Sequence, residues 1–479
     1  MPDVLTLKDF ENSGLNLDGF GQMSQGAVDE LNKALGTGTT PDGGAYGGTG
    51  AYASGNALMP ESLEGTLKVV TATEKHIKFW KDLDKKPAYN TVEEFNVMSS
   101  YGGDTSPFFV EGGLPEEEDS KYERKTALVK FLGTTRSITH PMTLVRTATA
   151  GGDIVSREAH NGTLWLLHQM ERQLFLGDSA INPLAFDGVV KQIINGTKKA
   201  DGSMGEQVFD MKGNPLGERV LEDASNVVGE NFGSPTKMYM TPKSLKDLSN
   251  IIYPHQRTGY PAPANGTLGA PLRSFQSNAG DFVFEPDLFL RPRGGAPETG
   301  RTGAPAAPAW DVTALAAGAS VTGVGLKAGT YTYTVTAVNV KGESAGVAAS
   351  TVAATANQAV TIKFTRVTSG NVATSYRIYR DNADGNVLFM VEVADPGAGT
   401  IVTVVDKNDD ISGTDIALLL DLDSEQSMAF KQLAPLMKLP LARISAAERF
   451  MILLYGMPLV YNPKRNVLIK NIGRFVETV

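Results

Sequence analysis

Histidine is the side chain best suited to acid–base and metal chemistry, and the chain has only five: His76, His140, His160, His168 and His255. His160 and His168 fall on one predicted helix, about 12 Å apart along its axis, which is too far to share a metal ion. No carboxylate completes a metal-binding helix pattern, and no nucleophile elbow or dinucleotide fingerprint occurs. We therefore expect no catalytic site, no metal and no cofactor.

Cysteine content and net charge exclude further classes of function. The chain has no cysteine, which excludes disulfides and thiol catalysis, and its net charge of −9 argues against a general nucleic-acid binder. The glycine-rich run 48–55 lacks the Lys-Ser/Thr ending of a phosphate loop. No apolar run approaches a membrane span, and the first residues lack signal-peptide features. These features predict a protein made and used in a reducing cytoplasm.

Four acidic residues in a row are the remaining candidate site: Glu116, Glu117, Glu118 and Asp119. They end a loop over residues 102–119, which is longer than compact domains usually contain. Two interpretations stay open. The run is either a solvated loop tip, or it docks on a basic surface of another subunit. The flanking segments 89–101 and 121–138 are predicted as paired strands, so the acidic residues would lie at the end of a long hairpin.

A long amphipathic helix is predicted over residues 153–177 and would support this hairpin. Apolar residues recur three or four apart along it, which forms one helical stripe. Asp153 is a suitable N-cap, and Gly177 is expected to end the helix in a left-handed conformation. Gly162 weakens the helix by about 1 kcal/mol relative to alanine and could mark a bend. We call this element the spine helix.

The remaining body reads as mixed α and β structure. Helices are expected at 220–230 and 243–252, around a buried strand at 238–240, and residues 186–194 read as a short helix or strand. Residues 430–439 are apolar and irregular, and a terminal strand follows a turn within 461–472. Since the pieces after residue 418 lack a core of their own, they should complete the body that begins before residue 300.

A segment of different composition separates these two parts of the body. Residues 294–308 have the composition of a linker, and residues 329–337 then alternate strictly between apolar or aromatic residues and threonine. Further short strands are predicted at 360–364, 375–380, 387–393 and 400–405. Many short strands in about 100 residues indicate a β-sandwich. The run Tyr331–Ser344 resembles immunoglobulin-like and fibronectin type III-like modules, and the sandwich would be an insertion in the body.

The order of the predicted parts along the chain is a flexible arm, a long hairpin, the spine helix, a mixed α and β body and an inserted sandwich. In this order they resemble the parts of the major capsid proteins of tailed bacteriophages with the Hong Kong-type (Johnson) fold. Short motifs carry the likeness: Phe79–Ala88, Leu176–Ser179 with Phe186–Gly188, Ser234–Met240, and Met437–Ala442 with Leu454–Gly456. The likeness covers residues from about 60 to 475. It implies a chain that assembles into hexamers and pentamers of an icosahedral head around packaged DNA.

The resemblance also implies roles for the segments. Residues 84–139 would be the extended loop over a neighbouring subunit. Residues 141–196, with pieces near 282–290 and the C-terminal strand, would form a peripheral domain, and 220–260 with 431–457 an axial domain. Its implied partners are other copies of the chain and a portal, scaffold, maturation protease or decoration protein. It implies a virion location after assembly in the host cytoplasm, and no membrane.

The expected fold class is therefore α+β with an inserted all-β sandwich. The expected division is a flexible arm over 1–60, a body over 61–300 and 416–479, and the sandwich over 308–415. The alternative function is a surface- or carbohydrate-binding protein that acts through the sandwich. That alternative needs exposed aromatic platforms, whereas the tyrosines at 331, 333, 376 and 379 alternate as core residues would.

Overall fold

The structure is a computed structural model, and it describes residues 17–18, 22–23, 71, 73–144 (without 104–105, 107 and 115), 154–256, 272–290, 295–297, 300–320, 325–381, 385–443 and 445–475. This part of the chain is α+β, with strands predominating. Within the predicted arm, the described residues are β1 (Leu17–Asp18) and β2 (Gln22–Met23), which pair antiparallel. The rest of the arm lies outside the described residues. No described helix is long and apolar enough to cross a membrane.

A six-stranded mixed sheet lies at the centre of the body. Its strands, in order, are β7 (Val208–Asp210), β22 (Val467–Ile472), β19 (Asp415–Leu420), β8 (Lys237–Met240), β10 (Gly280–Pro286) and β9 (Ser274–Ser277). Strands β10 and β19 both pair with β8, one parallel and one antiparallel. The chain therefore leaves this sheet after β10 and returns to it, on the other side of β8, at β19.

Both faces of the central strands of this sheet, β22, β19 and β8, are buried. One face packs on helices α7 (Glu218–Glu230) and α8 (Pro242–Gln256), and the other on the spine helix and α6 (Val189–Thr197). Along β19, Ala417 and Leu419 face the first core while Leu418 and Leu420 face the second. A strand buried on both faces reads as an uninterrupted apolar run because neither set of alternating side chains meets water.

The second body sheet is built from long strands. Its order is β3 (Lys85–Pro87), β20 (Met428–Pro440), β21 (Ala447–Val460) and β6 (Lys130–Thr139). Residues 430–439, expected to be irregular, therefore form a strand. Pro435 falls within a register shift between Ala434 and Met437, where a residue without an N–H group does not interrupt the ladder.

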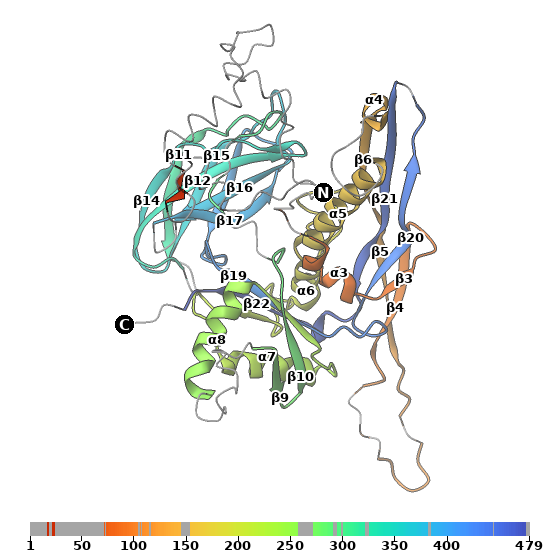
Figure 1. Ribbon diagram of the computed structural model, residues 1–479. Coiled ribbons are helices and arrows are strands. Elements are labelled where there is room, and N and C mark those ends of the chain that lie inside the picture. The colour runs from red at the N-terminus through yellow and green to blue at the C-terminus, as the bar shows by residue number, and fades with distance from the viewer. Residues whose placement is uncertain are drawn as a thin grey trace, which may run out of the picture. The chain divides into compact units, whose positions relative to one another are not determined.

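The spine helix, α5 (Ile154–Leu176), forms as predicted and lies beside this second sheet (Figure 1). The expected N-cap, Asp153, lies outside the described residues. Gly177 is not left-handed, so that expectation is wrong. Glycine is needed there for space, because a Cβ atom would lie 2.5 Å from the Phe186 carbonyl oxygen. At Gly162 a Cβ atom would lie 2.7 Å from Ile452 Cδ1, so this glycine lets β21 approach the helix.

The predicted return strand of the hairpin, 121–138, is two strands with different partners. Residues Lys121–Leu128 form β5, which pairs with β4 (Val92–Ser100). Residues 130–139 form β6, which pairs with residues 447–456 of β21. Buried Val129 lies between the two strands and is bonded to the Thr91 carbonyl oxygen. The hairpin that leaves the body is therefore shorter than the predicted 84–139 loop.

The implied grouping into peripheral and axial domains is wrong in part. Residues 431–457 form β20 and β21, which belong to the spine-helix sheet and not with helices α7 and α8. Residues 282–286 and the C-terminal strand β22 belong to the six-stranded sheet with those helices. Segment order alone did not settle which strands share a sheet, since the pairing partners are far apart in sequence.

Between β10 and β19 the chain forms two further sheets around a separate core. One contains β11 (Trp310–Ser320), β15 (Gln358–Thr365) and β18 (Ile401–Asp406). The other contains β13 (Gly342–Glu343), β12 (Gly329–Asn339), β16 (Ser375–Asp381) and β17 (Val387–Ala394), with β14 (Ser350–Ala354) paired to β12. Their shared core includes Val335, Ile362 and Tyr376.

The expected linker is partly packed against these sheets. The Arg301 amide donates to the Glu343 carbonyl oxygen at 3.2 Å, and the Phe389 amide donates to that of Gly295 at 3.3 Å. Gly300 approaches Ala345 so closely that a Cβ atom would lie 2.9 Å from its backbone nitrogen. The described parts of 295–304 therefore belong with the sheets that follow them, although their composition is that of a linker.

Gly456 provides a test of packing between the long strands. A Cβ atom there would lie 2.4 Å from a ring carbon of Phe430 and 2.7 Å from the Lys431 carbonyl oxygen. We expect G456A to lower the free energy of unfolding of the full chain by about 1–3 kcal/mol, because the backbone oxygen cannot move aside. Denaturant titration measures this. The control is G329A, at a site with no atom within 4 Å, and equal stability of the two variants would contradict the packing argument.

Candidate functional site

The antiparallel pair β4–β5 and its connecting loop form a ribbon that projects from the body (Figure 1). Its two strands pair only with each other among the described strands. Most side chains of β5 are exposed, and those of β4 alternate between exposed and half-buried. A two-stranded ribbon without a core is marginal in water. Among the described residues, the contacts that hold the ribbon lie at its base.

The base of the ribbon is anchored to the body at two points. Lys431 Nζ of β20 lies 3.0 Å from Glu93 Oε1, and this ion pair is largely shielded, with side-chain exposures of 17% and 15%. The ring of Phe95 meets Tyr461 edge to face, with centroids 5.4 Å apart. Both anchors lie in the first half of β4. The outer half of the ribbon has no such contact with the body among the described residues.

The loop at the ribbon end carries an apolar tip, which we define as Phe108, Phe109, Val110 and Leu114. Phe108 is 88% exposed, Val110 81% and Leu114 92%. A turn presents them, because the Gly113 amide donates to the Val110 carbonyl oxygen at 2.8 Å and Gly112 adopts a φ of +82°. Large apolar side chains exposed together mark an interaction surface.

Sequence reasoning selected the acidic residues of this loop and missed its apolar tip. The available signal was the run Phe108–Val110 inside a loop rich in glycine and proline. Three consecutive large apolar residues are unusual in a segment predicted to be a solvated turn.

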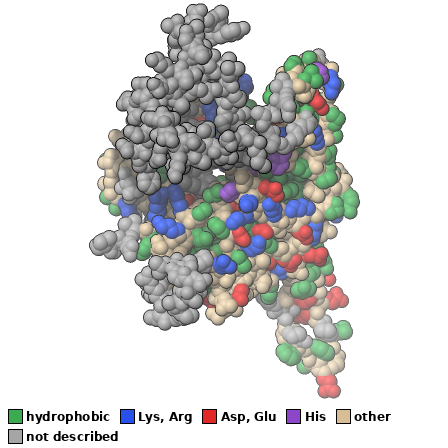
Figure 2. All heavy atoms as spheres, in the orientation of Figure 1, with side chains coloured by type: hydrophobic (Ala, Val, Ile, Leu, Met, Phe, Trp, Pro, Cys, Tyr) green, Lys and Arg blue, Asp and Glu red, His purple; other side chains and the backbone are tan. Residues whose placement is uncertain are grey.

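The four acidic residues lie together in the loop, exposed, before β5. Their roles differ. The Glu118 carboxylate accepts a hydrogen bond from the Gly103 amide across the loop, and a Cβ atom at Gly103 would meet the same carboxylate. Glu118 therefore closes the loop on itself. Glu116, Glu117 and Asp119 remain exposed beside the apolar tip, and Figure 2 shows acidic and hydrophobic side chains together on the ribbon.

Basic residues follow on β5, namely Lys121, Arg124 and Lys125. Arg124 lies 3.4 Å from Glu94 across the ribbon, an exposed pair of small energetic value. Charged side chains along an exposed strand edge disfavour pairing with other strand edges. The ribbon is thus charged along its strands, and large apolar side chains are exposed at its tip beside Glu111.

The tyrosines of the sandwich region do not form an aromatic platform. Tyr333, Tyr376 and Tyr379 are buried, and Tyr331 is half-buried. The Tyr333 hydroxyl donates to Asp406 at 2.8 Å, and burial raises the pKa of this tyrosine. Tyr379 donates to Glu343 inside the same region. These side chains satisfy one another, and the carbohydrate-binding alternative has no surface built from them.

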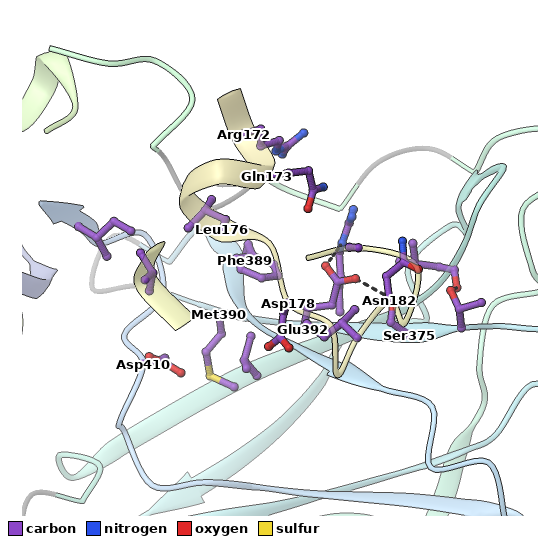
Figure 3. Close-up of a pocket in the computed structure, with 18 of the residues that line it drawn as sticks. Arg172, Gln173, Leu176, Asp178, Asn182, Ser375, Phe389, Met390, Glu392 and Asp410 are labelled. Carbon is purple, nitrogen blue, oxygen red and sulfur yellow. Dashed lines mark hydrogen bonds and ion pairs between the residues drawn. The ribbon is translucent and has the colours of Figure 1, made fainter. Parts of the chain in front are cut away.

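A cavity of about 470 Å³ lies between the end of the spine helix, the loop after it and β17 (Figure 3). Its acidic groups are paired within the protein. Asp178 bonds Lys191 at 2.9 Å, and Glu392 bonds Arg377 at 2.9 Å. Among the described residues, no group of three or more metal-ligating side chains occurs. The lining therefore does not select a class of ligand.

Comparison with known proteins gives one consistent match. No family model matches the chain. The major capsid protein of Staphylococcus phage K is 26% identical over 474 residues, covering 91% of this chain and 93% of that protein. That of Staphylococcus phage S25-3 matches with the same identity and coverage.

Among solved structures, the capsid structure of cyanophage P-SCSP1u aligns with a TM-score of 0.44 at 10% identity, covering 87% of this chain and 94% of that chain. An empty GTA particle capsid aligns with a TM-score of 0.42 at 11% identity, covering 89% and 99%. Scores this low do not establish a shared fold, so the sequence similarity carries the assignment. Along nine-tenths of its length, this chain is a homologue of phage major capsid proteins, and its function is that of a structural capsid protein.

Proposed function

We propose that the chain self-assembles into hexamers and pentamers that close an icosahedral phage head around packaged DNA. The observation that carries this proposal is the ribbon, which ends in exposed apolar side chains and has no third strand among the described residues. In a monomer such a tip would stay in water. In a shell, each tip would lie on a neighbouring copy, so every subunit would both donate and receive one contact.

The two kinds of side chain at the tip would have separate roles. Burial of Phe108, Phe109 and Leu114 would supply most of the docking energy, since apolar area removed from water contributes about 25 cal/mol per Å². The exposed carboxylates of Glu116, Glu117 and Asp119 would face lysine or arginine of the neighbour and select the docking position. Glu118 would act indirectly, by holding the loop closed on Gly103.

The proposal assigns no enzymatic role and no cofactor to the chain. DNA would be enclosed without sequence-specific contacts, which is compatible with a net charge of −9. The shell would be assembled in the host cytoplasm and would remain in the virion. A portal, scaffold, maturation protease or decoration protein would be its further partners.

In the proposed domain division, each segment is assigned to a domain by the sheet to which it belongs. Residues 61–294 and 415–479 would form the capsid body, with an N-terminal arm before it. The two sheets between β10 and β19 would be an inserted immunoglobulin-like sandwich. Support comes from its separate core and from its attachment through β10 and β19, which lie on the two sides of β8. The sandwich would project from the shell surface and contribute little to closure.

The apolar tip is tested by the double variant F108S/F109S. We expect an unchanged free energy of unfolding of the free subunit, since both side chains are already exposed, and a loss of most shell assembly. Size-exclusion chromatography with light scattering measures the assembly. The control is V340S, which removes a side chain of 87% exposure elsewhere on the chain. Normal shells from F108S/F109S would rule out docking through the tip.

The acidic residues are tested with E116Q/E117Q/D119N, which leaves Glu118 in place. We expect a lower assembly yield at low salt and a yield close to that of the parent chain well above 0.15 M salt, because exposed charge pairs are screened there. Assembly yield against ionic strength is the measurement, with E118Q examined in parallel. Identical salt curves for the triple variant and the parent chain would favour a merely solvated run.

The sandwich is tested by expressing it alone with two sets of ends. A fragment of residues 295–414 should unfold cooperatively with a β-rich circular dichroism spectrum. A fragment of residues 308–410 should be less stable, because it lacks the bonds from Gly295 and Arg301 to the sheet. Replacing 295–414 with a short Gly/Ser bridge should still permit shells. Unfolded fragments together with loss of assembly in the deletion would refute the division.

A further inference from the structure

A buried carboxylate of the spine helix holds the segment that leads into the ribbon. Glu171 is fully buried, and its Oε1 accepts hydrogen bonds from the amides of Lys78 at 2.8 Å and Phe79 at 2.6 Å. Its Oε2 accepts from the Trp80 amide at 2.8 Å. These amides begin the short helix α3 (Phe79–Asp82), which runs into β3 and then the ribbon. One side chain therefore satisfies three consecutive backbone donors of this segment.

A second buried carboxylate lies beside Glu171. Asp287, which follows β10, is 1% exposed and within hydrogen-bonding reach of Glu171. Its Oδ1 accepts from the Phe289 amide at 2.7 Å, whereas its Oδ2 is buried without a donor from the described residues. Burial, and then the neighbouring carboxylate, raise the pKa of Glu171 to about 8, and burial raises the pKa of Asp287. Two adjacent buried carboxylates cannot both be charged at low cost.

The hydrogen bonds indicate which carboxyl group holds the proton. The three amides at Glu171 favour its charged form, because each donates to a carboxylate oxygen. Asp287 Oδ2 receives no N–H or O–H donor in the described chain. A proton on Asp287 would let this oxygen donate to Glu171 and would complete the bonding of both groups. One proton between the two groups would therefore satisfy both of them.

Other charged and titratable groups surround the pair on every element that packs there. They are His168 on the spine helix; His76, Lys78, Asp82, Asp84 and Lys85 before the ribbon; Lys237 and Tyr239 on β8; and Glu285 on β10. The nearby cations have acidic or carbonyl partners of their own. Lys78 bonds Glu285 at 3.0 Å, Lys237 bonds Asp82 at 2.8 Å, and Lys85 bonds the Trp80 carbonyl oxygen at 2.5 Å. None replaces the shared proton.

We propose that Glu171 and Asp287 form a pH-dependent latch, which holds residues 78–80 on the spine helix while one proton lies between the two carboxyl groups. When the proton is lost, the two charges repel and the segment opens more readily. Since this segment leads into β3 and the ribbon, the latch sets how firmly the root of the ribbon is held. The proposal concerns the isolated subunit and does not depend on shell assembly.

The direction of the pH dependence follows from the raised pKa. In the open state both groups ionise near their ordinary values, 4.5 for the glutamate, whereas the closed state keeps one proton to about pH 8. The latch therefore weakens as pH rises from about 4.5 toward 8. With one proton released on opening, the opening equilibrium changes by about tenfold per pH unit in this window.

The test is hydrogen exchange of the Lys78, Phe79 and Trp80 amides in the full-length, unassembled chain, corrected for intrinsic exchange. Between pH 5 and 8 we expect their protection factors to fall by about tenfold per unit, since one proton is released on opening. D287N should reduce this slope, because its amide nitrogen can donate to Glu171 at every pH and so favours the charged form of the glutamate. E158Q, which changes another carboxylate of the spine helix, bonded to Arg136, should keep the parent slope.

A second variant covers the case in which D287N fails to fold. E171Q should lower protection of the three amides at all pH values, because a neutral carboxamide accepts hydrogen bonds from them more weakly than a carboxylate does. It should also reduce the slope, because only one of the two carboxyl groups remains. A flat pH profile in the parent chain would overturn the proposal. So would an unchanged slope in D287N, since the proton shared with Asp287 would then not be its cause.

Discussion

The body depends on one constraint: the central strands of the six-stranded sheet are covered by apolar side chains on both faces. Along β8, Met238 and Met240 pack toward helices α7 and α8, whereas Tyr239 packs toward the spine helix. The same alternation occurs along β19 and β22. Because the side-chain period of a strand is two, a register slip of one residue would exchange the two cores completely. The sheet thus fixes the spine helix, and with it the long strands β6 and β21 that carry the root of the ribbon.

The elements that the sequence predicted best have a strong local pattern. The spine helix shows an apolar stripe along its length, and β12 alternates over 329–337, so both could be placed without knowing their partners. Helices α7 and α8 were predicted for the same reason. By contrast, β19 reads only as a short apolar run, and Pro435 obscures β20. Partners distant in sequence decide such strands, as with residues 130–139 and 447–456.

The sequence pointed to one part of the candidate site and did not reveal the other parts. The acidic run at 116–119 is visible in sequence because charge is local, and the structure places it at the ribbon end. Whether Phe108 or Leu114 belongs to a core or to an interaction surface depends on its exposure, which composition does not reveal. Glu171 is the opposite case, since a glutamate inside an amphipathic helix normally faces water. Its burial follows from contacts with residues 78–80 and 287, which only the fold brings together.

The pairing of chain segments far apart in sequence also has a consequence for synthesis on the ribosome. Strand β3 pairs with residues 430–432, and β6 with 447–456. Such non-local contacts form slowly, and they cannot form before the C-terminal part has been translated. The sheets between β10 and β19 can close earlier, which shortens the effective loop that must be ordered when β19 joins β8. The root of the ribbon is thus completed last, so a truncated chain lacks a firmly held ribbon to offer a neighbour.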